Sequence, residues 1–229
     1  LVRESLRERH IQLTSAAHLV KPLGFLIPVY EADQRPLWMM KFGVRLYDFL
    51  SGRYLVKKHR SLGIEAIVEN VSSIKKQGLV GGVMYYDAQM DDARLCLENV
   101  LSANQRGADV ANYVEALSFI EEESHVVGVH VRDILRGSNF EVRAKKIVCA
   151  VGPWTNLFLM KERKPPEQRV RPTKGIHIVY RGQVSKFALL IPTQKDRRIF
   201  FIIPWKGNSL IGTTDTDFSG DPDAVDVDS

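Results

Sequence analysis

The residues whose types could do chemistry in this chain of 229 residues gather between positions 169 and 218. Apolar runs at 176–180, 187–191 and 199–204, with a fourth around 210–211, predict short strands separated by turn residues. Ammonium and guanidinium groups recognise phosphate and carboxylate. The stretch therefore predicts an antiparallel sheet whose polar strand ends form an anion-binding wall. The polar residues at these ends are Lys174, His177, Arg197, Arg198, Thr213, Thr214 and Asp215.

The composition limits the classes of protein and partner. Apolar residues make up 45% of the chain and charged residues 26%, which is typical of a soluble globular protein. The net charge of +5 favours an anionic partner. The sequence has no long basic block and no aromatic residues interleaved with a basic stripe, which argues against nucleic-acid binding. No apolar run approaches the roughly 20 residues of a membrane-spanning helix.

The cysteines and the first residue indicate the redox compartment of the chain and its relation to a longer protein. Cys96 and Cys149 lack the spacing of a metal site, and we expect both to be small core residues in a reducing compartment. The chain opens on Leu1 rather than on a methionine. We therefore expect it to be a piece of a longer protein.

The elements that must position the polar wall begin with an amphipathic pattern over 2–19, which predicts a helix stopped by Pro22 and Gly24. Residues 25–30 then predict a strand, and 36–50 predict a helix rich in aromatic residues and methionines. Such a stripe usually faces a core, so we expect core packing, with a cofactor-facing role as the alternative.

The middle of the chain predicts a strand followed by a capped helix. Residues 81–87 form the strand, and Asp91 or Asp92 then caps an amphipathic helix that ends at Gly107. The two carboxylates could also be read as a metal-binding or catalytic pair. Neighbouring helix residues point about 100° apart, however, which favours the cap.

An apolar run at 147–151 predicts a buried strand that follows a small meander and ends in Gly152-Pro153-Trp154. In doubly wound α/β folds, ligands bind at the carboxyl ends of such strands. The pattern therefore predicts the later part of a dinucleotide-binding domain. Gly152 lacks a side chain and would let the backbone pass close to a ligand.

Several segments together resemble the FAD-dependent glycerol-3-phosphate dehydrogenases, in family order and over nearly the whole chain. The family's Gly-rich GxGxxG turn, which holds the FAD pyrophosphate, has no counterpart here. The resemblance thus implies a central fragment that lacks this turn and the C-terminal domain. The segments are YYDAQMDDARL at 85–95, AVGPWT at 150–155, KGIH at 174–177, DRRIFF at 196–201, IPW at 203–205 and GTTDT at 212–216.

The resemblance implies a mixed α/β (α+β) fold: a partial doubly wound FAD/NAD-binding domain with an antiparallel-sheet substrate (cap) domain, of D-amino-acid-oxidase-like architecture. Residues 1–86 and 161–229 would form the two parts of the substrate domain, and 87–160 part of the FAD-binding domain. The implied cofactor is FAD. We expect the chain by itself to be inactive.

The reaction that the resemblance implies is the oxidation of sn-glycerol 3-phosphate to dihydroxyacetone phosphate, with hydride transfer from C2 to FAD. The electrons would then pass to a quinone. The implied location is cytoplasmic, with peripheral contact of the full-length protein on the inner face of the cytoplasmic membrane. A basic surface is compatible with acidic lipid.

The resemblance also assigns roles to the cations of the wall. Arg198 matches the family arginine that faces substrate, where its guanidinium would hold the C2 oxygen as it becomes alkoxide and then carbonyl. A surface strand arginine is the alternative, and Arg197 should point to the opposite face. His177 would act as a base or would orient a neighbour. Lys174 would touch substrate or flavin, or else form an exposed salt bridge.

The cofactor side would involve residues from the meander and the Gly-Pro-Trp segment. Val114 would flank the adenine, while Trp154 could equally be a core aromatic. Thr213, Thr214 and Asp215 would stabilise a strand end rather than act in chemistry. The residues that would approach the FAD backbone are Ala150, Gly152, Pro153 and Trp154.

Three other functions stay open. A glycerophosphate oxidase would pass the electrons to oxygen and form hydrogen peroxide. A related FAD-dependent amine or amino-acid oxidase would set Arg198 against a carboxylate, although the pairing of KGxH with GTTDTDF argues against it. The chain could also be a folded but inert module.

Overall fold

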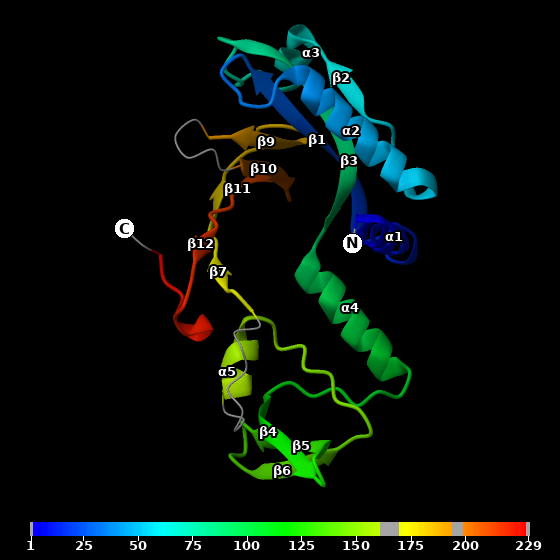
Figure 1. Ribbon diagram of the computed structural model, residues 1–229, viewed down its shortest axis with the longest axis vertical. Coiled ribbons are helices and arrows are strands. Elements are labelled where there is room, and N and C mark those ends of the chain that lie inside the picture. The colour runs from blue at the N-terminus through cyan, green and yellow to red at the C-terminus, as the bar shows by residue number, and fades with distance from the viewer. Residues whose placement is uncertain (1, 161–169, 194–198, 228–229) are drawn as a thin grey trace. The chain divides into compact units, whose positions relative to one another are not determined.

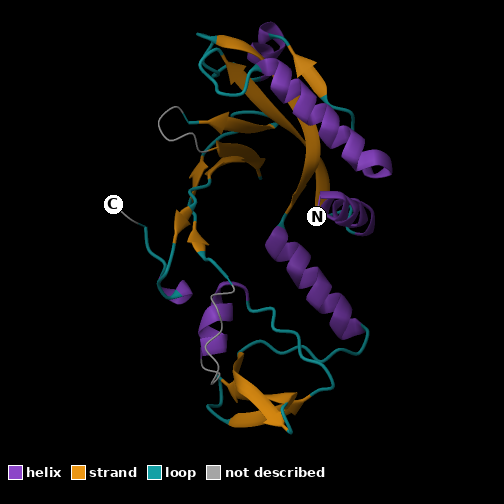
Figure 2. Cartoon of the chain, viewed as in Figure 1, coloured by secondary structure: helices purple, strands orange, loops and turns teal. Residues whose placement is uncertain are grey.

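The computed structural model describes residues 2–160, 170–193 and 199–227 (Figure 1). The chain divides into two compact units. The first contains Leu1–Asn99 and Gly175–Thr214, and the second contains Val100–Lys174 and Asp215–Ser229. Each unit combines strands with helices (Figure 2).

The first unit is built on a sheet whose described strands follow the order β2-β3-β1-β9-β10-β11-β8. Neighbouring strands run antiparallel except β1 and β9, which pair in parallel through Phe25 with Ala188 and Leu26 with Leu189. This pair joins an early segment to a late one. The strands are β1 (Val20–Tyr30), β2 (Arg60–Leu62), β3 (Leu79–Met90), β8 (His177–Tyr180), β9 (Ala188–Pro192), β10 (Ile199–Trp205) and β11 (Asn208–Gly212).

Helices cover both faces of this sheet. A Cβ on Gly81 of β3 would meet Leu37 of α2, whereas a Cβ on Gly82 would meet Ile67 of α3. Because successive strand residues point to opposite faces, α2 and α3 pack on opposite faces of β3. The helices of this unit are α1 (Val2–Ser15), α2 (Leu37–Ser51), the short η1 (Gly52–Tyr54) and α3 (Ile64–Asn70); α4 (Asp92–Gln105) begins here and continues into the second unit.

The core of the first unit lies on the α3 side of the sheet. Leu26 of β1 and Ile67 of α3 are fully buried, and Met84 and Leu189 pack with them from the strands on either side. Burying one such side chain stabilises the fold by about 1.5–3 kcal/mol. The alternation of burial along β1 follows from this arrangement, since every second residue faces the core.

The second unit contains a three-stranded antiparallel meander and short peripheral elements. Phe158 of α5 packs edge-on against Phe119 of β4, with ring centroids 5.1 Å apart, and is buried. This contact ties the helix to the meander. The elements are β4 (Val114–Glu122), β5 (His125–Asp133), β6 (Asn139–Arg143), η2 (Gly152–Trp154), α5 (Thr155–Met160), β7 (Thr173–Lys174), β12 (Thr216–Asp217) and η3 (Pro222–Ala224).

Most of the predicted elements are confirmed. The helices expected over 2–19 and 36–50 are α1 and α2, and the strand expected over 81–87 lies within β3. Asp91 is a cap, because its carboxylate accepts a hydrogen bond from the Arg94 N–H at 3.2 Å. Its other oxygen accepts one from Lys206 at 2.7 Å.

Two local predictions are wrong. Pro22 and Gly24 do not end α1, which stops at Ser15; they lie inside β1, whose pairing with β3 extends through them. The run at 147–151 is not a buried strand: Val148 is 85% exposed. Within the described part of the chain no strand pairs with it, so its backbone has no ladder to join.

The predicted burial of the cysteines and of the aromatic stripe is also wrong. Cys96 and Cys149 are both exposed. On α2, Trp38, Phe42 and Phe49 point away from the sheet and are 68%, 64% and 78% exposed. The helix packs through its opposite face instead, because Val44 and Ser51 are the residues that it buries.

The described residues contain neither a membrane-spanning helix nor a cluster of metal-binding side chains. No helix there has the length and apolarity needed to cross a membrane. No group of three or more His, Cys, Asp and Glu side chains comes close enough, among residues 2–160, 170–193 and 199–227, to hold a metal ion.

Candidate functional site

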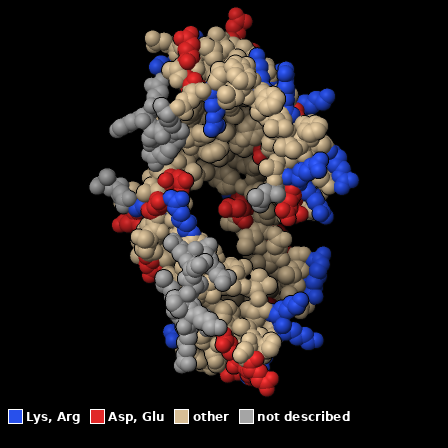
Figure 3. Space-filling model, viewed as in Figure 1, with Lys and Arg blue, Asp and Glu red and all other residues tan. Residues whose placement is uncertain are grey.

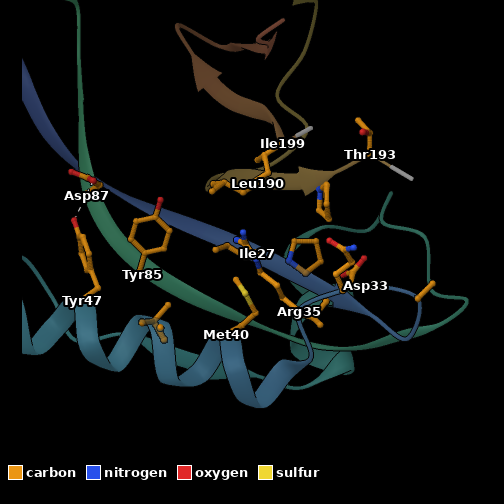
Figure 4. Close-up of a pocket in the computed structure, with 17 residues that line it drawn as sticks. Ile27, Asp33, Arg35, Met40, Tyr47, Tyr85, Asp87, Leu190, Thr193 and Ile199 are labelled. Atoms are coloured by element: carbon orange, nitrogen blue, oxygen red, sulfur yellow. Dashed lines mark hydrogen bonds between the residues drawn. The ribbon is translucent and has the colours of Figure 1, made fainter. Parts of the chain in front are cut away.

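A pocket of about 800 Å³ opens between α2 and the sheet of the first unit (Figure 4). Strands β1, β3, β9 and β10 form one wall and α2 forms the other. Met40 points from α2 into the space toward Ile27 of β1 (Figure 4). This volume lies within the usual range for small-molecule sites. The apolar lining residues are Ile27, Pro28, Val29, Met40, Val44, Leu190, Pro192 and Ile199.

One end of the pocket is polar and is organised by a buried arginine. The Arg9 side chain, from α1, is only 8% exposed and donates hydrogen bonds to the Tyr47 hydroxyl and, at 3.4 Å, to Asp87 Oδ1. It also donates to the Tyr54 carbonyl at 3.0 Å. The Tyr47 hydroxyl in turn donates to Asp87 Oδ2 at 3.3 Å, which Figure 4 shows as a dashed line.

The two tyrosines of this end remain protonated over a wide pH range. Burial raises the pKa of Tyr47 to about 12, and the negative charge of Asp87 adds to the shift. Burial likewise raises the pKa of Tyr85 to about 12, again with help from Asp87. Both phenols are therefore neutral hydrogen-bond donors at physiological pH.

The Tyr85 hydroxyl differs from that of Tyr47 in having no acceptor among the described residues. Two aromatic contacts fix its ring. The ring stacks on that of Phe25, with centroids 5.3 Å apart, and meets the Tyr47 ring edge-on, with centroids 5.5 Å apart. Tyr85 thus presents an oriented donor to the pocket (Figure 4).

His177 is placed by a second feature of the first unit, the pairing of β8 with β11. It lies opposite Gly212, and a Cβ on Gly212 would strike the His177 ring and the Ile176 carbonyl. The Ile176 N–H donates to Thr214 Oγ1 at 3.1 Å. The KGIH and GTTDT segments therefore contact each other through strand pairing and a hydrogen bond. Residue 212 must be glycine, because any side chain there would collide with His177 and Ile176.

Lys174 lies in the second unit and has contacts beside Phe218 and Asp226. Its ammonium group donates to the Asp226 carbonyl at 3.4 Å and lies 5.8 Å from the centroid of the Phe218 ring. In the first unit, the Thr213 hydroxyl donates to the Thr214 carbonyl at 2.7 Å. This bond fits the predicted strand-end role of Thr213.

The Gly-Pro-Trp segment forms the η2 turn of the second unit. Gly152 has φ +55°, in the left-handed region that favours glycine, and a Cβ there would have no atom within 4 Å. Trp154 is not a core residue: it is exposed and its indole N–H donates to Asp223 at 3.2 Å. Ala150 and Pro153 are exposed, and Val114 is half-buried at the start of β4.

Arg198, the main catalytic candidate, and Arg197 beside it lie outside the described residues. The other candidates fall into two groups. His177 belongs to the first unit, whereas Lys174, Val114 and the segment from Ala150 to Trp154 belong to the second.

Sequence reasoning missed the pocket between α2 and the sheet. A signal for part of it was present, since Tyr85 and Asp87 are two residues apart in a strand and must share one face. Nothing in the local pattern of α1 could have singled out Arg9. It stands among other charged residues of the helix, and only the tertiary structure buries it.

Comparison with known proteins settles the family. The family model described as FAD dependent oxidoreductase matches residues 1–229. The chain belongs to the FAD-dependent oxidoreductases. The mixed α/β fold and the FAD dependence predicted from the sequence are thereby confirmed for the family.

Relatives within this flavoenzyme family carry more specific names. The chain is 37% identical over 244 residues to a glycerol-3-phosphate dehydrogenase of Synechocystis sp., covering 98% of this chain and 43% of the relative. It is 36% identical over 224 residues to the mitochondrial glycerol-3-phosphate dehydrogenase of Homo sapiens, covering 94% of this chain and 30% of the relative. The chain thus spans less than half the length of these relatives.

Solved structures agree with the family assignment. The glycerol-3-phosphate dehydrogenase of Bacillus halodurans, complexed with FAD, matches with a TM-score of 0.74 and 31% identity, over 94% of this chain and 38% of that one. An L-proline dehydrogenase from P. horikoshii matches with a TM-score of 0.68 at 14% identity, over 92% of this chain and 54% of that one. The second likeness shows the fold alone.

The residues of the second unit fit the approach of an FAD molecule. The open space over Gly152 and the positive φ of its backbone leave room for a ligand beside the chain. The run at 147–151 is largely exposed and pairs with no described strand, so its backbone N–H groups can donate to such a ligand. These two observations keep Ala150, Gly152, Pro153 and Trp154 as cofactor candidates of this FAD-dependent oxidoreductase.

Proposed function

We propose that this chain serves the oxidation of sn-glycerol 3-phosphate to dihydroxyacetone phosphate, with a quinone as the final electron acceptor. The observation that carries the proposal is the match to proteins named glycerol-3-phosphate dehydrogenase, at 35–37% identity over nearly the whole chain. The KGIH and GTTDT segments, which the structure locks together, belong to the same resemblance.

Each candidate residue would have a role that follows from the chemistry of its side chain. FAD, when bound, supplies the acceptor for the hydride that leaves C2. Arg198 would hold the C2 oxygen and stabilise its developing charge, and His177 would accept the hydroxyl proton. Lys174 would attract the phosphate dianion. The residues that would hold FAD are Val114, Ala150, Gly152, Pro153 and Trp154.

An assay of the full-length protein tests this function. We expect it to reduce an artificial dye acceptor when glycerol 3-phosphate is added, whereas the 229-residue chain alone gives no turnover. Arg198→Ala should lower turnover by about two to three orders of magnitude while FAD stays bound, as expected for loss of a charge-stabilising donor. Arg197→Ala is the matched control. Absence of turnover in the unmodified protein would reject the proposal.

The same assay separates the rival oxidases. A glycerophosphate oxidase would yield hydrogen peroxide in proportion to substrate consumed, and we expect none. An amine or amino-acid oxidase would turn over amino acids rather than glycerol 3-phosphate. Transfer of electrons to a short-chain quinone, followed by its absorbance, tests the proposed acceptor directly.

The exposed face of α2 supports the proposed peripheral membrane contact. Trp38, Phe42 and Phe49 recur at helical spacing on this face, and Lys41 and Arg45 border it. A helix with an outward aromatic stripe beside cations is typical of one that lies in a membrane interface and attracts anionic lipid. Figure 3 shows basic side chains over the side of the first unit where α1 and α2 lie.

Vesicle binding tests this contact. The chain should sediment with phosphatidylcholine vesicles that contain phosphatidylglycerol, and far less with phosphatidylcholine alone. Replacing Trp38, Phe42 and Phe49 together by serine should abolish sedimentation. The control replaces Leu97 and Leu101, which are exposed on α4. Binding that survives the α2 substitutions would show that another surface meets the lipid.

A further inference from the structure

The pocket has a second polar end, remote from Asp87, where the chain passes from β1 to α2. Asp33, Gln34 and Arg35 line this end, and Figure 4 shows Asp33 on the side of the pocket opposite Asp87. Gln34 and Arg35 are exposed, so the pocket opens to solvent here. A ligand that enters from this side therefore meets a carboxylate, an amide and a guanidinium group.

The two charges at this entrance are available to a ligand. No ion pair joins Asp33 to Arg35, and Arg35 has no hydrogen bond to any residue that the structure describes. Asp33 Oδ2 accepts the Tyr30 N–H at 2.8 Å, which fixes the carboxylate and leaves its other oxygen for a ligand. An unpaired cation beside an unpaired anion attracts a zwitterion rather than a molecule with a net charge.

The Asp87 end of the pocket does not disturb this balance of charge. Arg9 donates to Asp87 Oδ1 at 3.4 Å, so its guanidinium group offsets the carboxylate. Tyr47 donates to Asp87 Oδ2, and Tyr85 is a neutral phenol. Among the described residues the charges at the two ends therefore cancel, which favours a ligand without a net charge.

Between its two ends the pocket is apolar and large. Ile27 and Leu190 belong to the sheet wall, and Met40 and Val44 belong to the α2 wall. Gly43 widens the space, because even a Cβ there would have no atom within 4 Å. A volume of about 800 Å³ is larger than a small polar metabolite needs, whereas a hydrocarbon chain gains affinity with each methylene that it buries.

The surroundings of the entrance indicate the source of such a ligand. Trp38 closely follows Arg35 in the sequence and is exposed, and Phe42 lies about one turn further along α2. Tryptophan is enriched at the level of lipid headgroups, and α2 is the helix for which a membrane contact is proposed above. A lipid at that surface would place its headgroup at the entrance and a chain in the pocket.

We propose that the pocket between α2 and the sheet takes up one acyl chain of a zwitterionic phospholipid with a primary amine, the class of phosphatidylethanolamine. Arg35 donates to the phosphate, Asp33 accepts from the ammonium group, and the chain lies between the α2 wall and the sheet wall. A quaternary ammonium group has no N–H to donate to Asp33, which distinguishes this lipid from phosphatidylcholine. The assignment deepens the proposed membrane contact, on which it rests for the source of the lipid.

Calorimetric titration of the full-length protein with monomeric 1-myristoyl-lysophosphatidylethanolamine tests the site. This probe carries the headgroup and a single chain, and below its critical micelle concentration it forms no lipid surface. We expect saturable binding of one lipid per chain. The phosphatidylcholine and phosphatidylglycerol forms of the lysolipid should bind about threefold to tenfold more weakly, because neither can donate an ammonium N–H to Asp33. Phosphoethanolamine without a chain should show no measurable binding.

Substitutions at the entrance test the two charges separately. Arg35→Gln should weaken binding by about tenfold, because it removes a charge-assisted hydrogen bond to the phosphate. Arg45→Gln is the matched control, since Arg45 is exposed on α2 outside the pocket lining. Asp33→Asn should remove the preference for the ethanolamine headgroup, while its amide oxygen can still accept the Tyr30 N–H.

A substitution in the wall tests whether the chain enters the pocket. Gly43→Phe fills the apolar space and should abolish binding, whereas Gly63→Phe, outside the lining, should leave it unchanged. Far-UV circular dichroism checks that Gly43→Phe folds, and Gly43→Leu, with a smaller side chain, replaces it if it does not. Lysolipid binding that persists in the folded pocket variant overturns the site. Equal binding of the three headgroups, or of phosphoethanolamine alone, overturns the assignment of the lipid.

The titration separates this assignment from the proposed function, because it uses neither vesicles nor glycerol 3-phosphate. Headgroup-selective lysolipid binding without vesicle sedimentation supports the pocket and rejects only the proposed membrane contact. The same binding beside a failed dehydrogenase assay supports the pocket and rejects only the proposed reaction.

Discussion

Arg9 is the residue on which the polar end of the pocket depends. Arg9→Met keeps the length of the side chain but removes every donor to Tyr47, Asp87 and the Tyr54 carbonyl. Breaking a buried charge pair costs about 3–5 kcal/mol, and because Asp87 is partly exposed we expect a loss of about 3 kcal/mol. Urea unfolding followed by circular dichroism measures this change.

The matched control for this substitution is Arg7→Met, on the same helix. Arg7 is exposed, and surface substitutions usually change stability by no more than about 0.5 kcal/mol. If the two variants unfold at the same urea concentration, the Arg9 contacts contribute nothing to stability.

Tyr47 and Tyr85 predict a pH dependence of stability on the alkaline side. An unfolded tyrosine has a pKa of 10.0, whereas the folded state holds both protons until about pH 12. Below pH 10 the two states bind equal numbers of protons. Between pH 10 and 12 the unfolded chain releases its protons first, so the free energy of unfolding falls as the pH rises.

Urea midpoints measured from pH 9 to pH 12 test this prediction. Tyr85→Phe should make the decline shallower, because one of the tyrosine protons linked to stability is gone. Tyr180→Phe, at an exposed tyrosine, should leave the slope as it is. An identical slope in Tyr85→Phe and in the unmodified chain would contradict the raised pKa of Tyr85.

At the scale of the element, α2 carries the clearest prediction. Gly43→Ala adds a side chain into open space in the helix interior, so it should stabilise the chain by about 1 kcal/mol through helix propensity alone. The measurement is the urea concentration at the midpoint of unfolding, which should rise while the dependence of the unfolding free energy on urea stays the same. Gly82→Ala serves as the opposite case, because its Cβ would strike the Ile27 carbonyl and should destabilise.

The distribution of apolar residues predicted the existence of α1, α2 and α4, and the apolar run that ends in Tyr85 and Tyr86 predicted β3. The sequence pattern gave wrong predictions where tertiary contacts determine the local structure or the buried face. The run at 147–151 has the apolar residues of a strand but no described partner, and a strand forms only beside another. The aromatic stripe of α2 faces outward because the opposite side of the helix already packs on the sheet.

The candidate site was predictable only in part for the same reason. Motif resemblance pointed to His177 and the Gly152 segment, and the structure adds a reason for glycine at 212 that the motif alone does not contain. The pocket gathers side chains from α1, α2, β1, β3 and β9. No local pattern can show that such distant residues meet, so Arg9 could be assigned only from the fold, whereas the sequence indicates only that Tyr85 and Asp87 share one face of a strand.

At the scale of the whole molecule, the division into two units predicts separable stability. Leu26 is fully buried in the first unit, and Leu26→Ala should cost about 2–5 kcal/mol. Phe158→Ala should remove the contact between α5 and β4 in the second unit. Hydrogen exchange with mass spectrometry should show faster exchange only in the unit that carries the substitution.

The control for both variants is Val148→Ala, at an exposed position that should leave exchange unchanged. Faster exchange throughout the chain after either core substitution would mean that the two units unfold together. That outcome would reject their independence, and it would leave the pocket and the family assignment as they are.

The parallel pairing of β1 with β9 has a consequence for synthesis on the ribosome. β1 emerges early, whereas β9 is translated only after the whole of the meander. Until then the nascent chain exposes an open strand edge and apolar surface, which invite aggregation. We therefore expect the nascent chain to need a chaperone that covers this strand edge until β9, which ends at Pro192, has been translated.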